Sequence, residues 1–153
     1  MVRKLAIVVI VLSVAAIVIG GVFVIEGFAK NKLIVDRMNI EKVTLATDPN
    51  NPTVVTQVNN AAEAQKAADT IAGHRRGIAP TYQDLLGGKP FDSTNATQLK
   101  YAQAMNLENY LYMAVTAFGL IQVTMATGAF MVIVGIALGC VGLVLWKLGK
   151  TIT

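Results

Sequence analysis

The side chains best suited to chemistry form a basic triplet, His74-Arg75-Arg76, in the middle of the chain. Two guanidinium groups beside an imidazole could contact an anion or a lipid headgroup, because arginine donates paired hydrogen bonds to phosphate and carboxylate oxygens. The triplet could equally be the solvated end of a helix, where positive charge is stabilised by the helix dipole. We keep His74, Arg75 and Arg76 as a candidate anion or headgroup contact, with the helix end as the simpler interpretation.

Other reactive side chains are too few to form a catalytic or metal site. His74 is the only histidine and Cys140 the only cysteine, whereas a zinc site usually takes four ligands and a non-haem iron site takes two histidines and a carboxylate. Asp84 and Asp92 have no nucleophile or base beside them. Cys140 lies deep in an apolar run, where we expect a small packing residue. The sequence therefore predicts no enzyme, no metal and no cofactor.

The composition defines the elements that must position these residues. The 153 residues are 54% hydrophobic and 14% charged, compared with about 45–50% and roughly 25% in soluble domains. All 13 basic and 9 acidic residues lie outside two windows, 5–25 and 109–146. A helix of about 20 apolar residues crosses a bilayer. The sequence predicts a membrane protein with two spans, separated by a segment that is too small for most enzyme folds.

Residues 5–27 are predicted to form the first transmembrane helix, after a basic tip of residues 1–4. A cleaved signal peptide is the alternative, because Arg3 and Lys4 precede the apolar run and Gly27-Phe28-Ala29 supplies small residues. The apolar core of a signal peptide usually has about 7–15 residues, and this run is longer. We therefore expect an uncleaved anchor.

The second uncharged window, 109–146, is too long for one crossing, since 38 helical residues would extend about 57 Å. It contains no proline and no Asn-Gly or Asp-Gly turn, so we expect one continuous helix rather than two short crossings. Its first half carries several polar side chains and its second half is almost wholly apolar. We place the second span at 122–146, between an outer domain of residues 28–121 and a tail of residues 147–153.

The charge distribution predicts the orientation. Residues 26–108 contain nine basic and nine acidic side chains, so the net charge of +4 comes from Arg3, Lys4, Lys147 and Lys150. Basic residues that flank spans stay in the cytoplasm. We expect a multi-pass protein of the cytoplasmic (inner) membrane with both termini in the cytoplasm. Basic clusters with interleaved aromatic residues are missing from the sequence, so we expect no nucleic-acid partner.

The outer domain is predicted to be mostly helical. Asn60 with Glu63 resembles a capping box that starts an Ala-rich helix to about Ala72, closed by Gly73 or Gly77. The remaining predicted elements are a helical extension over 28–38, an extended stretch over 40–47, a turn at 48–52, a short helix at 81–86 and a helix cap at 92–95. In the core of this domain we expect Tyr82, Leu85 and Leu86 to pack on Leu99, Ala102 and Met105 or Met113.

Small residues form one face of the predicted spans. The second span presents Gly128, Gly135, Gly139 and Gly142, and the first span presents Ala16 and Gly20. Small residues four apart let helix backbones approach closely inside a membrane. This face could pack the two spans of one chain together, or it could dock another subunit. The sequence leaves both interpretations open.

The order of motifs resembles a known group of proteins. The first span and the Ala-rich helix are followed by Thr81-Tyr82-Gln83-Asp84-Leu85 with Gly87-Gly88, and then by a helix that passes through Ala114-Val115-Thr116-Ala117-Phe118-Gly119 into the Gly-rich span. This arrangement resembles small, uncharacterised bacterial membrane proteins with two spans, some of which carry an automatic label as aromatic ring-opening dioxygenase subunits. That reaction needs a non-haem iron site, which one histidine cannot supply. The resemblance implies an architecture and a non-enzymatic role, and it assigns no functional residue.

The predicted fold class is mainly α: two transmembrane helices in an antiparallel hairpin, with a small extracytoplasmic domain. The expected function is that of an accessory or scaffold subunit in a larger membrane assembly, with the lipid bilayer and other membrane subunits, or further copies of the chain, as partners. The alternative is an extracytoplasmic binding module that holds an envelope lipid, a quinone or a secreted protein at the membrane surface.

Overall fold

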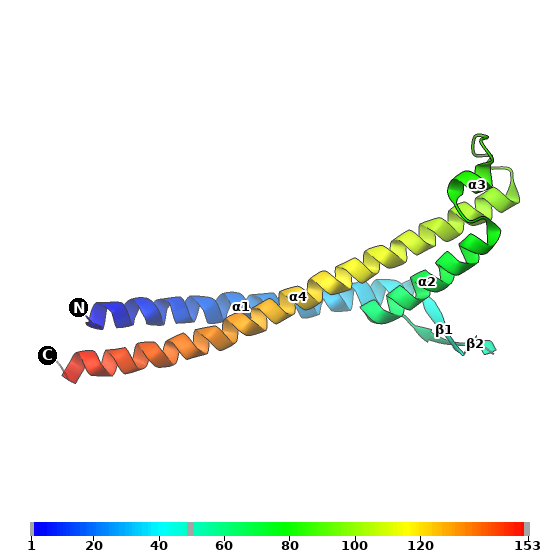
Figure 1. Cartoon of the computed structure of the whole chain (residues 1–153). Helices are drawn as coiled ribbons and strands as arrows, with labels where there is room; N and C mark the ends of the chain where they lie inside the picture. Colours follow the sequence, from blue (N-terminus) through cyan, green and yellow to red (C-terminus); the bar gives the residue numbers. More distant parts are fainter. Residues whose placement is uncertain (1, 49–50, 152–153) are drawn as a thin grey trace. The chain divides into compact units, whose positions relative to one another are not determined.

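The computed structural model describes residues 2–48 and 51–151. These residues form α1 (Val2–Ile40), β1 (Thr44–Asp48), β2 (Asn51–Gln57), α2 (Ala61–Ile78), α3 (Tyr82–Leu86) and α4 (Ala96–Thr151) (Figure 1). Their contacts divide the chain into two compact units. We call Met1–Lys32 with Leu120–Thr153 the helix pair, and Leu33–Gly119 the central unit.

The prediction of a mainly helical chain with two long apolar helices is confirmed. Among the described residues, α1 and α4 are long and apolar enough to cross a membrane. Only 11% and 17% of their most apolar windows are buried, whereas the core helix of a soluble domain would be mostly covered. The helix α4 runs for 56 residues without a break, so the expected single helix through 109–146 is also correct.

The central unit begins with the last turns of α1 and a hairpin of two strands. The strands pair antiparallel, with Thr44 opposite Gln57. The sequence placed the extended stretch too early, because Ile40 still belongs to α1 and the chain turns at Lys42, whose φ is +51°. Of the predicted turn over 48–52, residues 49–50 lie outside the described residues, and β2 already begins at Asn51.

The helix α2 starts as predicted and ends later than predicted. The Glu63 N–H donates to Asn60 Oδ1 at 2.9 Å, while Glu63 Oε2 accepts from the N–H of Asn59 at 2.7 Å. Neither Gly73 nor Gly77 closes the helix, which continues to Ile78. A glycine ends a helix only where the chain adopts a left-handed conformation, and here the turn comes at the following Ala79-Pro80 instead.

Two side-chain caps define the next elements. Thr81 Oγ1 accepts from the Asp84 N–H at the start of α3, which ends at Gly87 in the left-handed conformation, with φ +56°. Asn95 Oδ1 accepts from the Thr97 and Gln98 N–H groups at the start of α4. The short helix at 81–86 and the cap near Asn95 are therefore confirmed.

The core of the central unit lies where α2, the hairpin and α4 meet. Its buried members are Leu45, Val58, Ala64, Ala67, Ala68, Leu111 and Phe118. Alanines on one face of α2 allow close approach to α4, and each buried apolar side chain contributes roughly 1–3 kcal/mol. In this way α2 positions the polar side chains described below.

The expectation that Tyr82 is buried in a core around α3 is wrong, although its ring lies near Tyr101 of α4, with the ring centroids 6.1 Å apart. Tyr82 is 37% exposed, and Leu85 and Leu86 are only half-buried. Leu99 and Met113, their expected partners on α4, are exposed as well. The physical reason is that the 18 residues of α2 cover far more of α4 than the five residues of α3 can.

Candidate functional site

The helix pair is held by direct backbone contact between α1 and α4. A Cβ atom added at Gly20 would lie 2.6 Å from the Gly128 carbonyl oxygen, and one added at Gly135 would lie 2.6 Å from Ile17 Cγ1. Further along, a Cβ at Gly142 would lie 2.7 Å from Ile10 Cγ1. No side chain larger than hydrogen fits at these positions without movement.

The buried positions of the pair repeat every seven residues. They are Ala6, Ser13, Gly20 and Gly27 on α1, and Gly128, Gly135, Gly142 and Gly149 on α4. A seven-residue repeat keeps one seam in contact when helices supercoil with a left hand. The predicted face assumed straight helices and therefore left out Ala6, Ser13, Gly27 and Gly149. A search for small residues seven positions apart would have found them.

The other residues of the predicted face lie beside this seam. Ala16 and Gly139 are half-buried, and a Cβ at Gly139 would lie 2.8 Å from Ser13 Oγ. Ser13 itself is buried, and its hydroxyl donates to the Gly135 carbonyl oxygen at 2.6 Å. The expectation that Cys140 packs inside the helix contact is wrong, because Cys140 is exposed. The small residues therefore contact each other within one chain.

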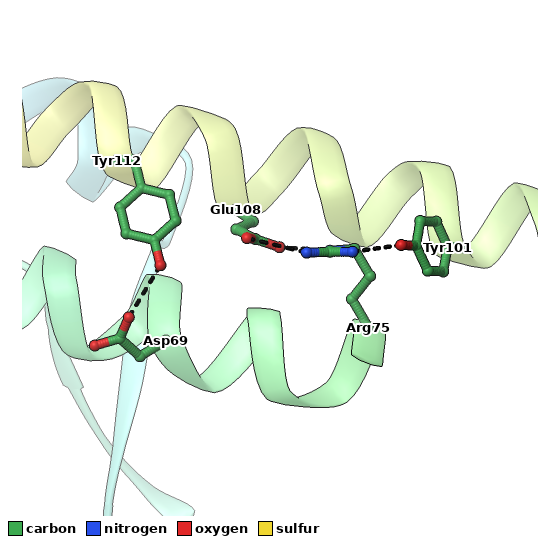
Figure 2. Close-up of polar contacts among 5 residues, drawn as sticks. All are labelled: Asp69, Arg75, Tyr101, Glu108 and Tyr112. Atoms are coloured by element: carbon green, nitrogen blue, oxygen red, sulfur yellow. Dashed lines mark hydrogen bonds and ion pairs between the residues drawn. The ribbon is translucent and has the colours of Figure 1, made fainter. Parts of the chain in front are cut away.

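The polar centre of the central unit is Arg75, which bridges α2 to α4. Its Nε donates to Glu108 Oε2 at 2.6 Å, its Nη2 to Glu108 Oε1 at 3.3 Å, and its Nη1 to the Tyr101 hydroxyl. Figure 2 shows the guanidinium between Glu108 on one side and Tyr101 on the other. Its carbon also lies 5.0 Å from the centroid of the Tyr101 ring.

This arrangement is an ion pair largely removed from water. The side chains of Arg75 and Glu108 are 13% and 9% exposed. The hydrogen bond that Arg75 donates to the Glu108 carboxylate, supported by the negative charge of that carboxylate, raises the pKa of Arg75 above the ordinary value for arginine, even though burial disfavours the charged form. The guanidinium therefore stays positively charged and bound to Glu108 and Tyr101.

The three residues of the predicted basic triplet therefore have different surroundings. Arg75 donates three hydrogen bonds to Glu108 and Tyr101, so its part in a contact with an external anion stays a prediction. His74 and Arg76 are exposed. Glu108 and Tyr101 were missed by the sequence analysis, although a carboxylate just before an uncharged helical stretch is a signal that it has a partner.

A second polar contact joins the same two helices. The Tyr112 hydroxyl donates to Asp69 Oδ1 at 3.0 Å (Figure 2). Asp69 Oδ1 also accepts from the Gln65 amide at 2.9 Å. Hydrogen bonding to the Asp69 carboxylate raises the pKa of Tyr112, because removal of its proton would break the bond and place two negative charges together.

An open groove runs between α2 and α4 in the central unit. Its volume is about 720 Å³, and it is lined by Ile71, Gly73, His74, Gly77, Ile78, Lys100, Gln103, Ala104 and Leu107. Sites for small ligands have volumes of about 300–1,000 Å³ and are mainly apolar with a few polar groups. The groove has both properties and is a candidate binding site.

The described residues offer little for catalysis. Within 2–48 and 51–151, the structure brings together no group of three or more His, Cys, Asp or Glu side chains that could hold a metal ion. The carboxylate of Asp84 accepts from Thr81 Oγ1, and that of Asp92 accepts from Thr94. Both carboxylates act in local turns next to helix starts.

Comparisons with protein-family models, with curated proteins and with solved structures give no match. Function must therefore be inferred from the helix pair, the exposed surfaces and the groove.

Proposed function

We propose that the chain is a non-enzymatic accessory or scaffold subunit of a larger membrane assembly. In this proposal α1 and α4 cross the cytoplasmic membrane as an antiparallel hairpin with both termini in the cytoplasm, and the central unit lies on the other side. The two apolar helices and the basic residues at their ends support this orientation.

The contacts between α1 and α4 support a placement of the two spans at the same depth in the bilayer. A Cβ at Gly27 would meet Met125, and one at Gly149 would meet Arg3. Residues 5–25 thus lie along residues 126–146, and each uncharged stretch would extend about 31 Å, close to the thickness of the hydrocarbon core. Arg3 lies 4.9 Å from the centroid of the Trp146 ring, a pairing suited to the headgroup region. We therefore move the expected start of the second span from 122 to about 126.

The observation that carries the scaffold proposal is the exposed apolar surface of α4 in the central unit. Tyr110 and Met113 are 69% and 66% exposed, and Leu107 is exposed beside them. In the proposed arrangement these side chains lie outside the bilayer, where water would surround them. Exposed apolar groups that cluster on one face are typical of protein interaction sites.

The alternative function, a binding module for an envelope lipid, a quinone or a secreted protein, draws support from the groove between α2 and α4. One chain can serve both functions, because different residues form the two sites. Gly73 and Gly77 line the groove, whereas Tyr110 and Met113 form the exposed apolar surface.

Topology can be tested with single cysteines. In a Cys140→Ala background, Ser93→Cys places a thiol on an exposed loop residue of the central unit. We expect an impermeant maleimide to label it in intact cells, and a reporter fused after the C-terminus to be active only in the cytoplasm. Labelling that requires broken cells would contradict the orientation.

The partner surface can be tested by site-specific photo-cross-linking. A photoreactive amino acid at Tyr110 should give one discrete adduct in membranes, and the same amino acid at Ser93 should not. Met113→Glu should weaken the adduct by roughly tenfold or more, since residues central to an interface contribute about 2 kcal/mol each. Identical adducts from both sites, or none from either, would contradict a specific partner at this surface.

A further inference from the structure

The groove between α2 and α4 contains a feature that the packing of the chain does not explain. Gly73 and Gly77 lie about one turn apart in the interior of α2, where glycine is unfavourable relative to alanine. A Cβ added at either position would find no atom within 4 Å among the described residues. Neither glycine is needed for a contact within the chain, and both deepen the floor of the groove.

The charged side chain among the described lining residues of the groove is Lys100. The imidazole of His74 and the amide of Gln103 line it as well, and none of its described lining residues is acidic. The carboxylate of Glu108, two turns along α4 from Lys100, is bound to Arg75 and so does not oppose an anion. An anionic group is therefore the complementary ligand at the Lys100 end.

The rest of the lining is hydrocarbon. Leu107 lies seven residues from Lys100 on α4, about 10 Å along the helix axis, and Ile71 borders the same end of the groove. A ligand that satisfies both ends has an anionic head at Lys100 and an apolar tail toward Leu107.

We propose that the groove binds a single-chain anionic lipid, of which a long-chain fatty acid is the simplest form. Its carboxylate lies at Lys100, and its hydrocarbon chain covers Gly73 and Gly77 and extends toward Leu107. The volume of about 720 Å³ is within the range of about 300–1,000 Å³ for sites that bind small ligands. The inference rests on the membrane location of the proposed function. Leu107 is the one residue that belongs both to the groove and to the exposed apolar surface of the scaffold proposal.

The test uses the full chain in nanodiscs of phosphatidylcholine with a photoreactive diazirine analogue of palmitic acid. We expect saturable labelling of peptides from α2 and from residues 96–107, and competition by unlabelled palmitate. A photoreactive alcohol of the same length should label these peptides less. Labelling confined to the two uncharged stretches, residues 5–25 and 126–146, would overturn the proposal.

Two variants test the two halves of the ligand. Gly77→Leu adds a side chain that meets open space in the protein and should reduce groove labelling by about tenfold or more, because each excluded methylene weakens binding roughly fourfold. Lys100→Gln should reduce it by up to about fivefold, the effect expected for an exposed charge pair. Ala62→Leu and Lys66→Gln, exposed on α2 outside the groove lining, are the matched controls and should label like the parent chain.

The remaining outcomes also decide the proposal. Unchanged labelling in Gly77→Leu, with α2 shown to be helical by hydrogen exchange, would overturn it. Equal labelling by the acid and the alcohol would overturn the anionic head. A Gly77→Cys, Cys140→Ala chain that forms disulfide dimers and excludes palmitate would show that a second copy covers the groove, which would also overturn the proposal.

Discussion

A methyl group added at Gly20 or Gly128 of the helix pair would meet the opposite backbone, whereas one added at Gly73 or Gly77 of the central unit would meet open space. All four are helical glycines, and glycine is unfavourable in each case. In the pair this cost is offset by close contact between backbones, which is the main source of helix association in lipid. In α2 nothing within the described chain offsets it. The comparison shows that glycine content alone does not identify a helix contact.

The two units also differ in how their helices are joined. The pair relies on small residues and the hydrogen bond from Ser13 to Gly135. In the central unit, α2 and α4 are connected by the ion pair of Arg75 and Glu108 and by the bond from Tyr112 to Asp69.

The largest expected effect is loss of the ion pair. Glu108→Gln should destabilise the central unit by about 3 kcal/mol, because it leaves the Arg75 charge buried without a partner. Hydrogen exchange of α2 amides in the full chain would measure this loss, with the exposed Glu41→Gln as the control. The double variant Arg75→Met, Glu108→Leu should recover most of the stability. A single variant as stable as the parent would mean that the ion pair does not hold α2 to α4.

The next effect tests the seam of the helix pair with adjacent residues. Gly20→Ala should destabilise the pair by about 1–3 kcal/mol, the usual cost of overpacking. Gly21→Ala should not destabilise the pair, since a Cβ there meets no atom within 4 Å. Steric trapping of the pair in micelles would measure both. Equal effects at the two positions would contradict the contact of Gly20 with Gly128.

Alanine at Gly73 or Gly77, where a Cβ meets open space, should have the opposite effect on stability. Gly73→Ala and Gly77→Ala should each stabilise α2 by up to about 1 kcal/mol, because alanine is the better helix former and no clash opposes it. Slower hydrogen exchange of the α2 amides is the expected observation. Destabilisation by either substitution would show that these glycines pack like those of the pair.

A smaller effect is expected from the buried hydroxyl of the pair. Ser13→Ala removes the bond to the Gly135 carbonyl and should cost about 0.6 kcal/mol, an average value for hydrogen bonds between membrane helices. The exposed Thr127→Ala on α4 is the control. A loss of several kcal/mol would assign the association to this bond rather than to close packing.

The smallest effect is a dependence on alkaline pH in the central unit. The bond to Asp69 raises the folded pKa of Tyr112 above the ordinary value near 10. Its contribution to stability is therefore complete below about pH 10 and is lost as the pH rises through the raised pKa. Unfolding followed at a series of alkaline pH values should show this decline, and Tyr112→Phe should flatten it. An unchanged profile in the variant would assign the decline to other groups.

Much of the fold could be predicted because it depends on local chemistry. The capping pair of Asn60 and Glu63 and the unbroken helix through 109–146 follow from hydrogen-bonding capacity and from the absence of helix breakers. The end of α2 could not be predicted in this way. Gly73 and Gly77 can end a helix or continue one, and the tertiary contacts of Arg75 favour continuation.

The candidate sites were less predictable than the helices. Five glycines of the helix contact, Gly20, Gly128, Gly135, Gly139 and Gly142, were identified from their spacing. The seven-residue seam was missed because the prediction assumed straight helices with about 100° per residue. The central core was assigned to Tyr82 and its neighbours, because Leu99, Ala102 and Met105 lie at helical spacing on a face that needs to be covered. In the structure, the alanines of α2 cover α4 and leave Tyr82 at the surface.

The sequence by itself determined which residues form long apolar helices, where the net positive charge lies, and that the chain has one histidine and one cysteine. These properties depend on composition and on neighbours within a few turns. Only the tertiary structure decided that the small residues face each other within one chain, that Arg75 is held by Glu108, and that Gly73 and Gly77 line an open groove. The reason is that these contacts join residues 33 positions apart in the ion pair and 122 positions apart in the bond from Ser13 to Gly135, and a local pattern carries no information about which distant residue will be the partner.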